Sequence, residues 1–135
     1  MRILGIDYGN KKIGLAFGDS DVRVAVPIDV VPNAGDATLD VFARKVIAED
    51  IDVIVVGVPL STGEHHNANQ LERTRTFIQA LERVVTIPVV EEDESYTTAE
   101  SIRLQREEGA EASEDALAAM LIVQAYIERI TTGTS

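Results

Sequence analysis

Residues 2–17 carry the sequence RILGIDYGNKKIGLAF, and this stretch decides the fold. It opens as a short apolar run that ends in the carboxylate of Asp7, turns through residues 8–10, and then resumes an extended pattern. Two such runs around a turn that contains Gly-Asn are typical of a β-hairpin. We therefore predict two antiparallel strands, at 2–7 and 12–17, with an acidic residue at the end of the first.

Outward from this hairpin, the apolar pattern predicts a third strand and then alternating helices and strands. Residues 22–31 are rich in β-branched side chains, and Pro27 within them indicates an edge strand or a bulge. The other elements we expect are a helix from 37 with Leu39, Phe42, Ala43, Val46 and Ile47 at helical spacing, a doubly buried strand at 51–58, a helix at 68–84, a strand at 87–90, and helices at 97–107 and 113–130. This order predicts an α/β fold whose mixed sheet has an antiparallel three-strand meander followed by parallel strands, with helices on both faces.

Composition narrows the class of protein further. The 135 residues suit one domain, which we place at 1–131 with a flexible tail at 132–135. The absence of cysteine excludes disulfides and thiolate metal sites, and no apolar run could span a bilayer, so we expect a cytoplasmic protein without membrane contact. The net charge of -11 argues against general nucleic-acid binding unless cations cluster on one face and metal ions offset acids.

Acidic residues stand at three places where a surface role explains them poorly. Asp7 ends the first strand, which is where sites form in α/β sheets, although aspartate is also a common turn former. Asp93 and Glu94 follow the predicted strand 87–90 within a run of four acids, more than helix-dipole stabilisation requires. Asp115 opens the last helix.

The face of the last helix that carries Asp115 is otherwise small and apolar. It holds Ala118, Ala119, Ile122 and Tyr126, which suits close packing on a sheet. An acid in the first turn after a Ser113 cap would be ordinary, but a charge directed towards the core needs a partner, and a cation is an effective one. If the three acidic positions meet, their oxygen ligands favour Mg²⁺ or Mn²⁺, and two such ions support phosphoryl transfer.

The histidines do not add to such a site. His65 and His66 are adjacent in a polar loop, and zinc would need further nitrogen or sulfur ligands that the chain lacks. We expect both to be solvated loop residues.

Four motifs in order resemble those of the YqgF family, also called RuvX, of RuvC-like Holliday junction resolvases and ribosomal RNA precursor nucleases. They are LGIDYGNKKIGLA at 4–16, VVGVPL at 55–60 with Arg75 and Phe77 after it, Asp93-Glu94 with Thr97-Thr98, and Asp115 with Ala118-Ala119 and QAY at 124–126. The resemblance covers nearly the whole chain and implies a ribonuclease H-like fold.

The resemblance also implies roles for single residues. Asp7, Glu94 and Asp115 would be the metal-binding catalytic acids, with two Mg²⁺ or Mn²⁺ ions, and Asp93 could assist them. Lys11, Lys12 and Arg75 would contact phosphate. The chain departs from the family pattern at Ser95, where arginine is usual, and in the loop 61–67, which puts substrate grip in doubt but leaves the acids in place.

The function we expect is a nuclease that processes the 5′ end of pre-16S rRNA, with structured RNA or ribosomal precursor particles as partners. Resolution of Holliday junctions in branched DNA is the first alternative. It would require a symmetric dimer, and because the sequence shows no evident dimer stripe we expect a monomer or weak homodimer. A non-catalytic binding module is another alternative, with Ser95 marking decay. A nucleotide-binding ATPase or sugar kinase would need two lobes, and the chain has length for one.

Overall fold

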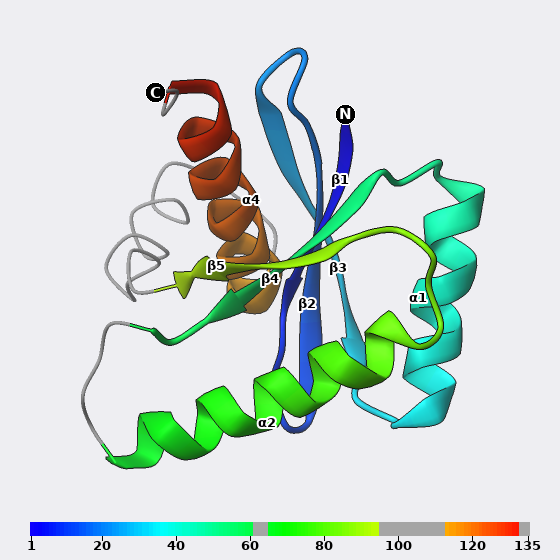
Figure 1. The fold of residues 1–135 in the computed structure, drawn as a ribbon, viewed down its shortest axis with the longest axis vertical. Coiled ribbons are helices and arrows are strands. Elements are labelled where there is room, and N and C mark those ends of the chain that lie inside the picture. The colour runs from blue at the N-terminus through cyan, green and yellow to red at the C-terminus, as the bar shows by residue number, and fades with distance from the viewer. Residues whose placement is uncertain (61–64, 95–112, 133–135) are drawn as a thin grey trace.

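A five-stranded mixed sheet organises the protein, whose computed structural model describes residues 1–60, 65–94 and 113–132 (Figure 1). The strand order across the sheet is β3-β2-β1-β4-β5. The strands are β1 (Arg2–Asp7), β2 (Lys12–Asp19), β3 (Val24–Pro32), β4 (Val53–Val58) and β5 (Val89–Asp93).

Strand direction explains where a site can form. The first three strands run antiparallel to one another, whereas β4 and β5 run parallel to β1. The predicted meander followed by parallel strands is therefore confirmed. Because β1, β4 and β5 point the same way, their carboxyl ends meet at one edge of the sheet, which is where α/β proteins place their sites.

Helices cover both faces of the sheet, as predicted (Figure 1). Helices α1 (Asp36–Ala48) and α2 (His65–Glu82) pack on one face around Phe42 and Phe77, and α4 (Glu114–Thr132) packs on the other through Leu117 and Val123. None of the helices in the described ranges is long and apolar enough to cross a membrane. The helix predicted at 97–107 and the tail at 133–135 lie outside the described residues.

Two features of the strands follow the sequence prediction. All six residues of β4 are buried, as its unbroken apolar run indicated. Strand β3 lies at the edge of the sheet, and its pairing with β2 shifts register where Asp29 is opposite Leu15 and Pro27 is opposite Ala16. Pro27 thus lies both at an edge and beside a bulge, because a residue without an N–H cannot serve a central ladder.

Several element boundaries shift by a few residues from the prediction, and one expected core residue is exposed. Strand β5 does not stop before the acidic run but continues through Glu91 and Glu92 to Asp93, because the strand is paired with β4 along this stretch. Helix α2 begins at His65 and α4 continues to Thr132. Ile47, expected on the buried face of α1, is 79% exposed.

Helix α1 buries one polar side chain, that of Thr38, on the same face as Phe42 and Val46. Its hydroxyl donates to the carbonyl oxygen of Pro32 at 2.8 Å and accepts from the N–H of Ala34 at 2.8 Å. These bonds fix the chain just before the helix, and they satisfy the hydroxyl group of a threonine that is buried.

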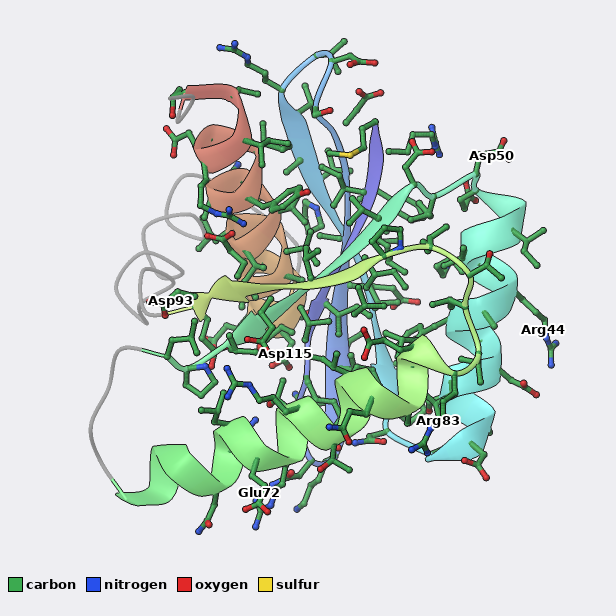
Figure 2. All side chains as sticks on the ribbon, viewed as in Figure 1. Arg44, Asp50, Glu72, Arg83, Asp93 and Asp115 are labelled. Carbon is green, nitrogen blue, oxygen red and sulfur yellow. The ribbon has the colours of Figure 1, made fainter. Side chains whose placement is uncertain are left out.

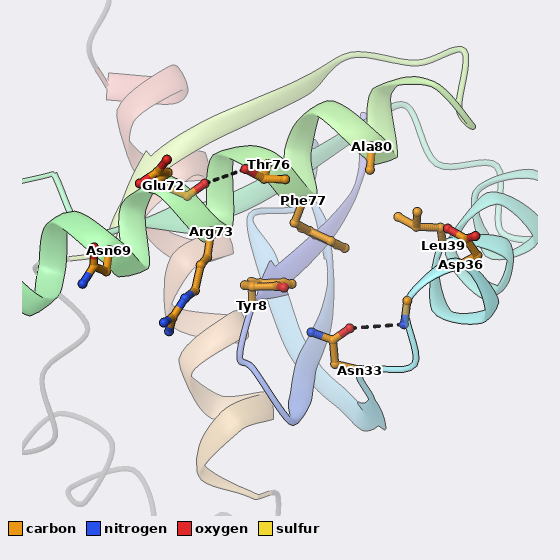
Figure 3. A pocket seen from close by; sticks show the side chains of 11 residues that line it. Tyr8, Asn33, Asp36, Leu39, Asn69, Glu72, Arg73, Thr76, Phe77 and Ala80 are labelled. Atoms are coloured by element: carbon orange, nitrogen blue, oxygen red, sulfur yellow. Dashed lines mark hydrogen bonds between the residues drawn. The ribbon is translucent and has the colours of Figure 1, made fainter.

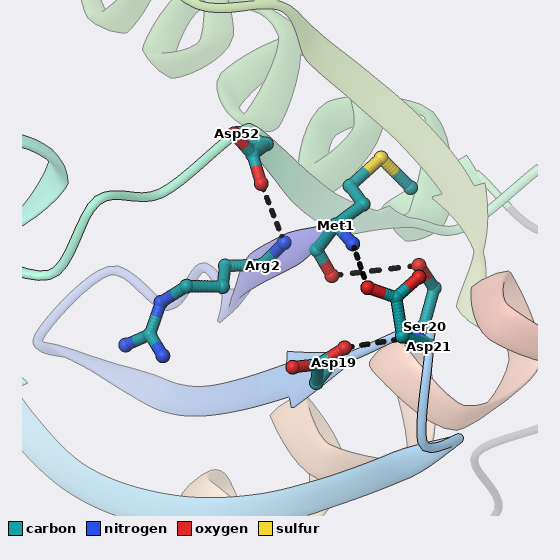
Figure 4. A network of polar contacts seen from close by, with 6 residues as sticks. All are labelled: Met1, Arg2, Asp19, Ser20, Asp21 and Asp52. Atoms are coloured by element: carbon teal, nitrogen blue, oxygen red, sulfur yellow. Dashed lines mark hydrogen bonds and ion pairs between the residues drawn. The ribbon is translucent and has the colours of Figure 1, made fainter.

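Polar contacts fix the opposite end of β1, away from the carboxyl edge (Figure 4). The backbone N–H of Arg2 donates to the Asp52 carboxylate at 2.7 Å, and the N-terminal ammonium of Met1 lies 3.3 Å from Asp21. The N–H of Ser20 donates to the carbonyl oxygen of Met1 at 3.0 Å. Because strand rise is constant, fixing the first residues of β1 against its neighbours also fixes where Asp7 lies.

The structure exposes an apolar stripe on and before β3, where the sequence shows no evident dimer stripe. Val22 is 66% exposed, and Val24, Val26 and Ile28 are also exposed. The stripe is formed by alternate residues of an edge strand, which is why the sequence, with no knowledge of which strand face is covered, does not reveal it.

Candidate metal-binding and catalytic site

Three carboxylates from distant parts of the chain gather at the carboxyl edge of the sheet. Asp7 is the last residue of β1, Glu94 directly follows β5, and Asp115 lies in the first turn of α4. Figure 2 shows Asp93 at the end of β5 and Asp115 near the start of α4. Asp7 lies close enough to both Glu94 and Asp115 for their charges to raise its pKa.

A close backbone contact brings Asp115 to Asp7. Gly14 of β2 is opposite Asp7 in the hairpin, and the carbonyl oxygen of Asp115 lies directly over Gly14. A β carbon at Gly14 would overlap this oxygen, so only glycine allows the first turn of α4 to approach the hairpin so closely. Ser113 caps the helix: its hydroxyl accepts from the N–H of Ala116 at 3.3 Å.

Glu94 reaches the same edge over β4. Its Oε2 atom lies 3.1 Å from the place where a β carbon on Gly57 would stand. Gly57 is opposite Glu92 in the parallel pairing of β4 with β5, so the missing side chain opens the space into which Glu94 turns. A larger residue at 57 would also overlap Ile122 of α4.

Burial and charge crowding perturb two of the acids. Burial, and then the charges of Glu94 and Asp115, together raise the pKa of Asp7 from its ordinary 3.8 to about 7. Burial also raises the pKa of Glu94, with the charge of Asp93 adding to the effect. Crowded carboxylates that resist ionisation form a place where a cation is strongly favoured.

A cation from the protein already contacts this cluster. The ammonium of Lys12, in the first position of β2, lies 3.1 Å from Oδ2 of Asp115. The expectation that the Asp115 carboxylate needs a positive partner is therefore met, in this structure, by a lysine. The family resemblance implied a phosphate contact for Lys12, and the sequence did not predict this ion pair.

The three acids have the right donor atoms for a divalent ion, but their side chains are not arranged to share one in this structure. All are hard oxygen donors, the set that selects Mg²⁺ or Mn²⁺. Within the described ranges, however, no three acidic or histidine side chains lie close enough together to hold one ion. Asp115 is bound by Lys12, so its carboxylate must turn before it can join Asp7 on a shared ion.

The other predicted site residues fall in different surroundings. Lys11 is exposed at the hairpin turn, beside Lys12. Arg75 makes a two-pronged ion pair with Glu91 of β5, both contacts at 2.9 Å, so its observed contacts are with this carboxylate and not with the three acids. The side chains of His65 and His66, with Ser95 and the loop 61–64, lie outside the described residues.

A further ion pair, which the sequence did not predict, supports the carboxyl edge of the sheet. Glu92 in β5 is only 8% exposed, and its carboxylate accepts from Arg129 of α4 at 2.8 and 2.9 Å. The guanidinium also lies over the Tyr126 ring, 5.3 Å from its centroid. The pair joins β5, which leads to Glu94, to the helix that carries Asp115.

A mixed sheet of this order, with carboxylates gathered at its carboxyl edge, defines the ribonuclease H-like class. Residues 1–129 match the family model described as "RuvX: Holliday junction resolvase", and the chain belongs to this family. The predicted family and fold class are thus confirmed.

Relatives and solved structures agree with this placement. A protein of Syntrophus aciditrophicus named "Putative pre-16S rRNA nuclease" is 34% identical over 97% of this chain and 91% of its own length. One of the same name from Chloroflexus aggregans is 32% identical over 93% and 92%. The fold resembles T. thermophilus RuvC in complex with a Holliday junction substrate, with a TM-score of 0.60, 16% identity, and coverage of 98% of this chain and 97% of that chain. It also resembles the Fowlpox virus resolvase, with a TM-score of 0.57, 15% identity, and coverage of 98% and 100%.

Proposed function

We propose that this protein is a metal-dependent endonuclease that hydrolyses phosphodiester bonds and processes the 5′ end of pre-16S rRNA. The observation that carries the proposal is that Asp7, Glu94 and Asp115 lie at one sheet edge, where burial, and then the charges of Glu94 and Asp115, raise the pKa of Asp7 to about 7. The names of the relatives from Syntrophus aciditrophicus and Chloroflexus aggregans support the choice of substrate.

The three acids would hold one or two Mg²⁺ or Mn²⁺ ions, with Asp93 close by. Such ions supply charge that activates water and stabilises the leaving oxygen. Asp7 is the central ligand, since it is coupled to both other acids and is the most strongly perturbed. Glu94, at the outer side of the edge, orients the attacking water and accepts its proton. The water oxygen bonds to phosphorus as the bond to the leaving oxygen breaks, and the products are a phosphate end and a hydroxyl end.

Substrate grip depends on a small number of cations, since the chain carries a net charge of -11. Lys11 and Lys12 stand on the turn next to Asp7, and both are exposed to solvent. Two neighbouring cations on this turn can hold phosphate beside the acids, while the net negative charge of the chain disfavours binding elsewhere.

The decisive experiment compares two labelled substrates, a precursor fragment spanning the 5′ end of 16S rRNA and a four-way DNA junction, with Mg²⁺ or Mn²⁺. The Asp7→Asn variant and EDTA serve as controls. Cutting of the RNA that Asp7→Asn and EDTA abolish is the expected result. Binding of the RNA without cutting, at any tested metal concentration, would instead identify a non-catalytic binding module.

A Holliday junction resolvase is the second candidate, and one structural observation favours it. Cutting two strands of a junction takes two sites, and the exposed stripe of Val22, Val24, Val26 and Ile28 is a surface on which two copies could pair. Preferred cutting of the DNA junction, together with a dimer in analytical ultracentrifugation, would establish this function over RNA processing.

A further inference from the structure

A pocket of about 590 Å³ lies between the β1–β2 turn, the start of α1 and helix α2 (Figure 3). We propose that it binds an unpaired nucleobase of the nucleic-acid substrate, one that carries an exocyclic amino group. The proposal rests on the nuclease function above and adds a subsite to it. The volume falls within the range of pockets that hold small organic ligands.

An aromatic pair forms one wall of the pocket. Tyr8 and Phe77 stack with ring centroids 4.5 Å apart, and Phe77 meets Phe42 edge-on at 6.1 Å. Tyr8 is only partly buried, and both it and Phe77 line the pocket. Aromatic side chains of this kind are the surfaces on which proteins stack unpaired bases.

The wall is held in place before any ligand arrives. The side-chain amide of Gln70 donates to the carbonyl oxygen of Tyr8 at 3.3 Å, and that of Asn33 donates to the carbonyl oxygen of Gly9 at 2.9 Å. Asn33 also accepts from the N–H of Gly35 at 3.5 Å, the contact drawn in Figure 3. Because the turn is tied to both sides of the pocket, a bound base would lose little energy to reorganisation.

The charges around the pocket select a base over a phosphate group. Asp36 and Glu72 line it, and two carboxylates accept hydrogen bonds from amino groups but repel phosphate. Among the described residues that line the pocket, Arg73 is the one cation, and we assign its guanidinium to the nucleic-acid backbone beside the base. Adenine, guanine and cytosine carry the amino group that this lining recognises, whereas uracil does not.

The position of Tyr8 in the sequence links the pocket to the acids. Tyr8 directly follows Asp7, the last residue of β1: the charge of Asp115 of α4 acts on Asp7, while the Tyr8 ring stacks on Phe77 of α2. A nucleic-acid strand that crosses the carboxyl edge of the sheet can therefore place a phosphate over the acids and a neighbouring base in the pocket. Such an arrangement would favour cutting beside an unpaired base.

The test uses a stem of double-stranded RNA with a short single-stranded flank in which 2-aminopurine replaces one unpaired base at a time. Binding is measured in EDTA, so that no cutting occurs, by the quenching of 2-aminopurine and by the dissociation constant. We expect one flank position to be quenched on binding. Tyr8→Leu should remove this quenching and weaken binding about tenfold, whereas Tyr8→Phe should retain both.

Two further variants keep the proposal falsifiable if Tyr8→Leu folds poorly. Arg73→Gln, on the exposed side of α2, should weaken binding of every flank equally. Glu72→Gln should reduce the ratio by which the protein binds a flank with an amino-bearing base more tightly than the same flank with uracil. Equal quenching and affinity in wild type, Tyr8→Leu and Arg73→Gln would overturn the subsite.

The outcome is separable from that of the nuclease proposal. Metal-dependent cutting by wild type with no quenched flank position would retain the nuclease and reject the pocket. The fluorescence of free 2-aminopurine ribonucleoside monophosphate is measured in the same way. If the protein quenched it with the same dissociation constant as the RNA, the pocket would be a small-molecule site, and the substrate-base assignment would be overturned. Absence of RNA binding by wild type in EDTA, together with absence of RNA cutting in Mg²⁺ and in Mn²⁺, would reject both.

Discussion

The ammonium of Lys12 lies 3.1 Å from Oδ2 of Asp115, so one of the three acids is already neutralised by a cation from the first hairpin. A divalent ion that binds Asp115 must therefore displace this lysine or draw the carboxylate away from it. In the proposed mechanism, Lys12 would hold Asp115 in the absence of metal and would become available to a phosphate group once an ion took its place.

This relationship predicts that Lys12→Met binds Mn²⁺ more tightly than wild type. Removing the competing cation frees Asp115, and because the pair is partly exposed the gain should be about two- to fivefold in affinity. Isothermal titration with Mn²⁺ measures it. Lys11→Met is the matched control, since it removes the neighbouring exposed cation and should leave metal affinity nearly unchanged. Weaker Mn²⁺ binding by Lys12→Met would show that the lysine supports the site and does not compete with metal.

The raised pKa of Asp7 predicts that Asp7→Asn abolishes cleavage yet stabilises the metal-free protein at pH 8. A carboxyl whose pKa is about 7 when folded and 3.8 when unfolded favours the folded state fully below pH 3.8. That stability is lost as the pH rises to about 7, since folding then opposes ionisation. Asparagine carries no charge at this position. The free energy of unfolding of Asp7→Asn should therefore exceed that of wild type by roughly 2–4 kcal/mol at pH 8, and the difference should vanish near pH 4.

Thermal unfolding in EDTA across this pH range tests the effect. Saturating Mg²⁺ should reverse the order of the two proteins at pH 8, since only wild type has the full set of acids to bind it. A melting temperature for Asp7→Asn below that of wild type at pH 8 in EDTA would contradict the burial of an unneutralised charge at this position.

The contact between Gly14 and Asp115 predicts that Gly14→Ala moves the first turn of α4 off the hairpin. The added methyl group should cost about 1–3 kcal/mol and weaken Mn²⁺ binding, because Asp115 moves away from Asp7. Urea unfolding and metal titration give the two readouts. Gly18→Ala is the matched control: it overpacks the same helix against Val123, at a part of the sheet away from the acids. Equal metal affinity in both variants would show that this contact does not position Asp115.

The Glu92–Arg129 pair predicts a loss of stability when only one partner is removed. Arg129→Met leaves the carboxylate of Glu92 buried without its cation and should cost about 1–3 kcal/mol. The double variant with Glu92→Met should recover part of the loss in a double-mutant cycle. Arg75→Met, which breaks the more exposed pair with the adjacent Glu91, should cost less than about 1 kcal/mol. Equal losses of stability in Arg129→Met and Arg75→Met would mean that the burial of Glu92 does not make its ion pair more important than that of Glu91.

Local patterns in the sequence were enough to predict much of the sheet and one face of the last helix. The strand at 51–58, the edge position of Pro27 and the burial of Ala118, Ala119, Ile122 and Tyr126 all follow from periodicity or from the chemistry of a single residue. These features depend on near neighbours in the chain, so a single sequence contains them.

What the sequence did not reveal depends on partners far along the chain. A run of four acids is typical of a loop, but Glu92 lies in a strand and is buried because Arg129 of another element neutralises it. Lys12 pairs with Asp115 only because the last helix lies across the first hairpin. The gathering of the acids at one edge likewise depends on tertiary packing, and their role in metal binding stays a prediction.

The contact of Gly14 with Asp115 also bears on how the protein is made. The acids come from the first strand and from the last helix, so a growing chain on the ribosome has Asp7 long before it has Asp115. Synthesis that stops before α4 leaves the acids unassembled and the apolar sheet face uncovered. A shortened product is therefore recognisable as waste by its exposed surface, and it cannot act as an uncontrolled nuclease.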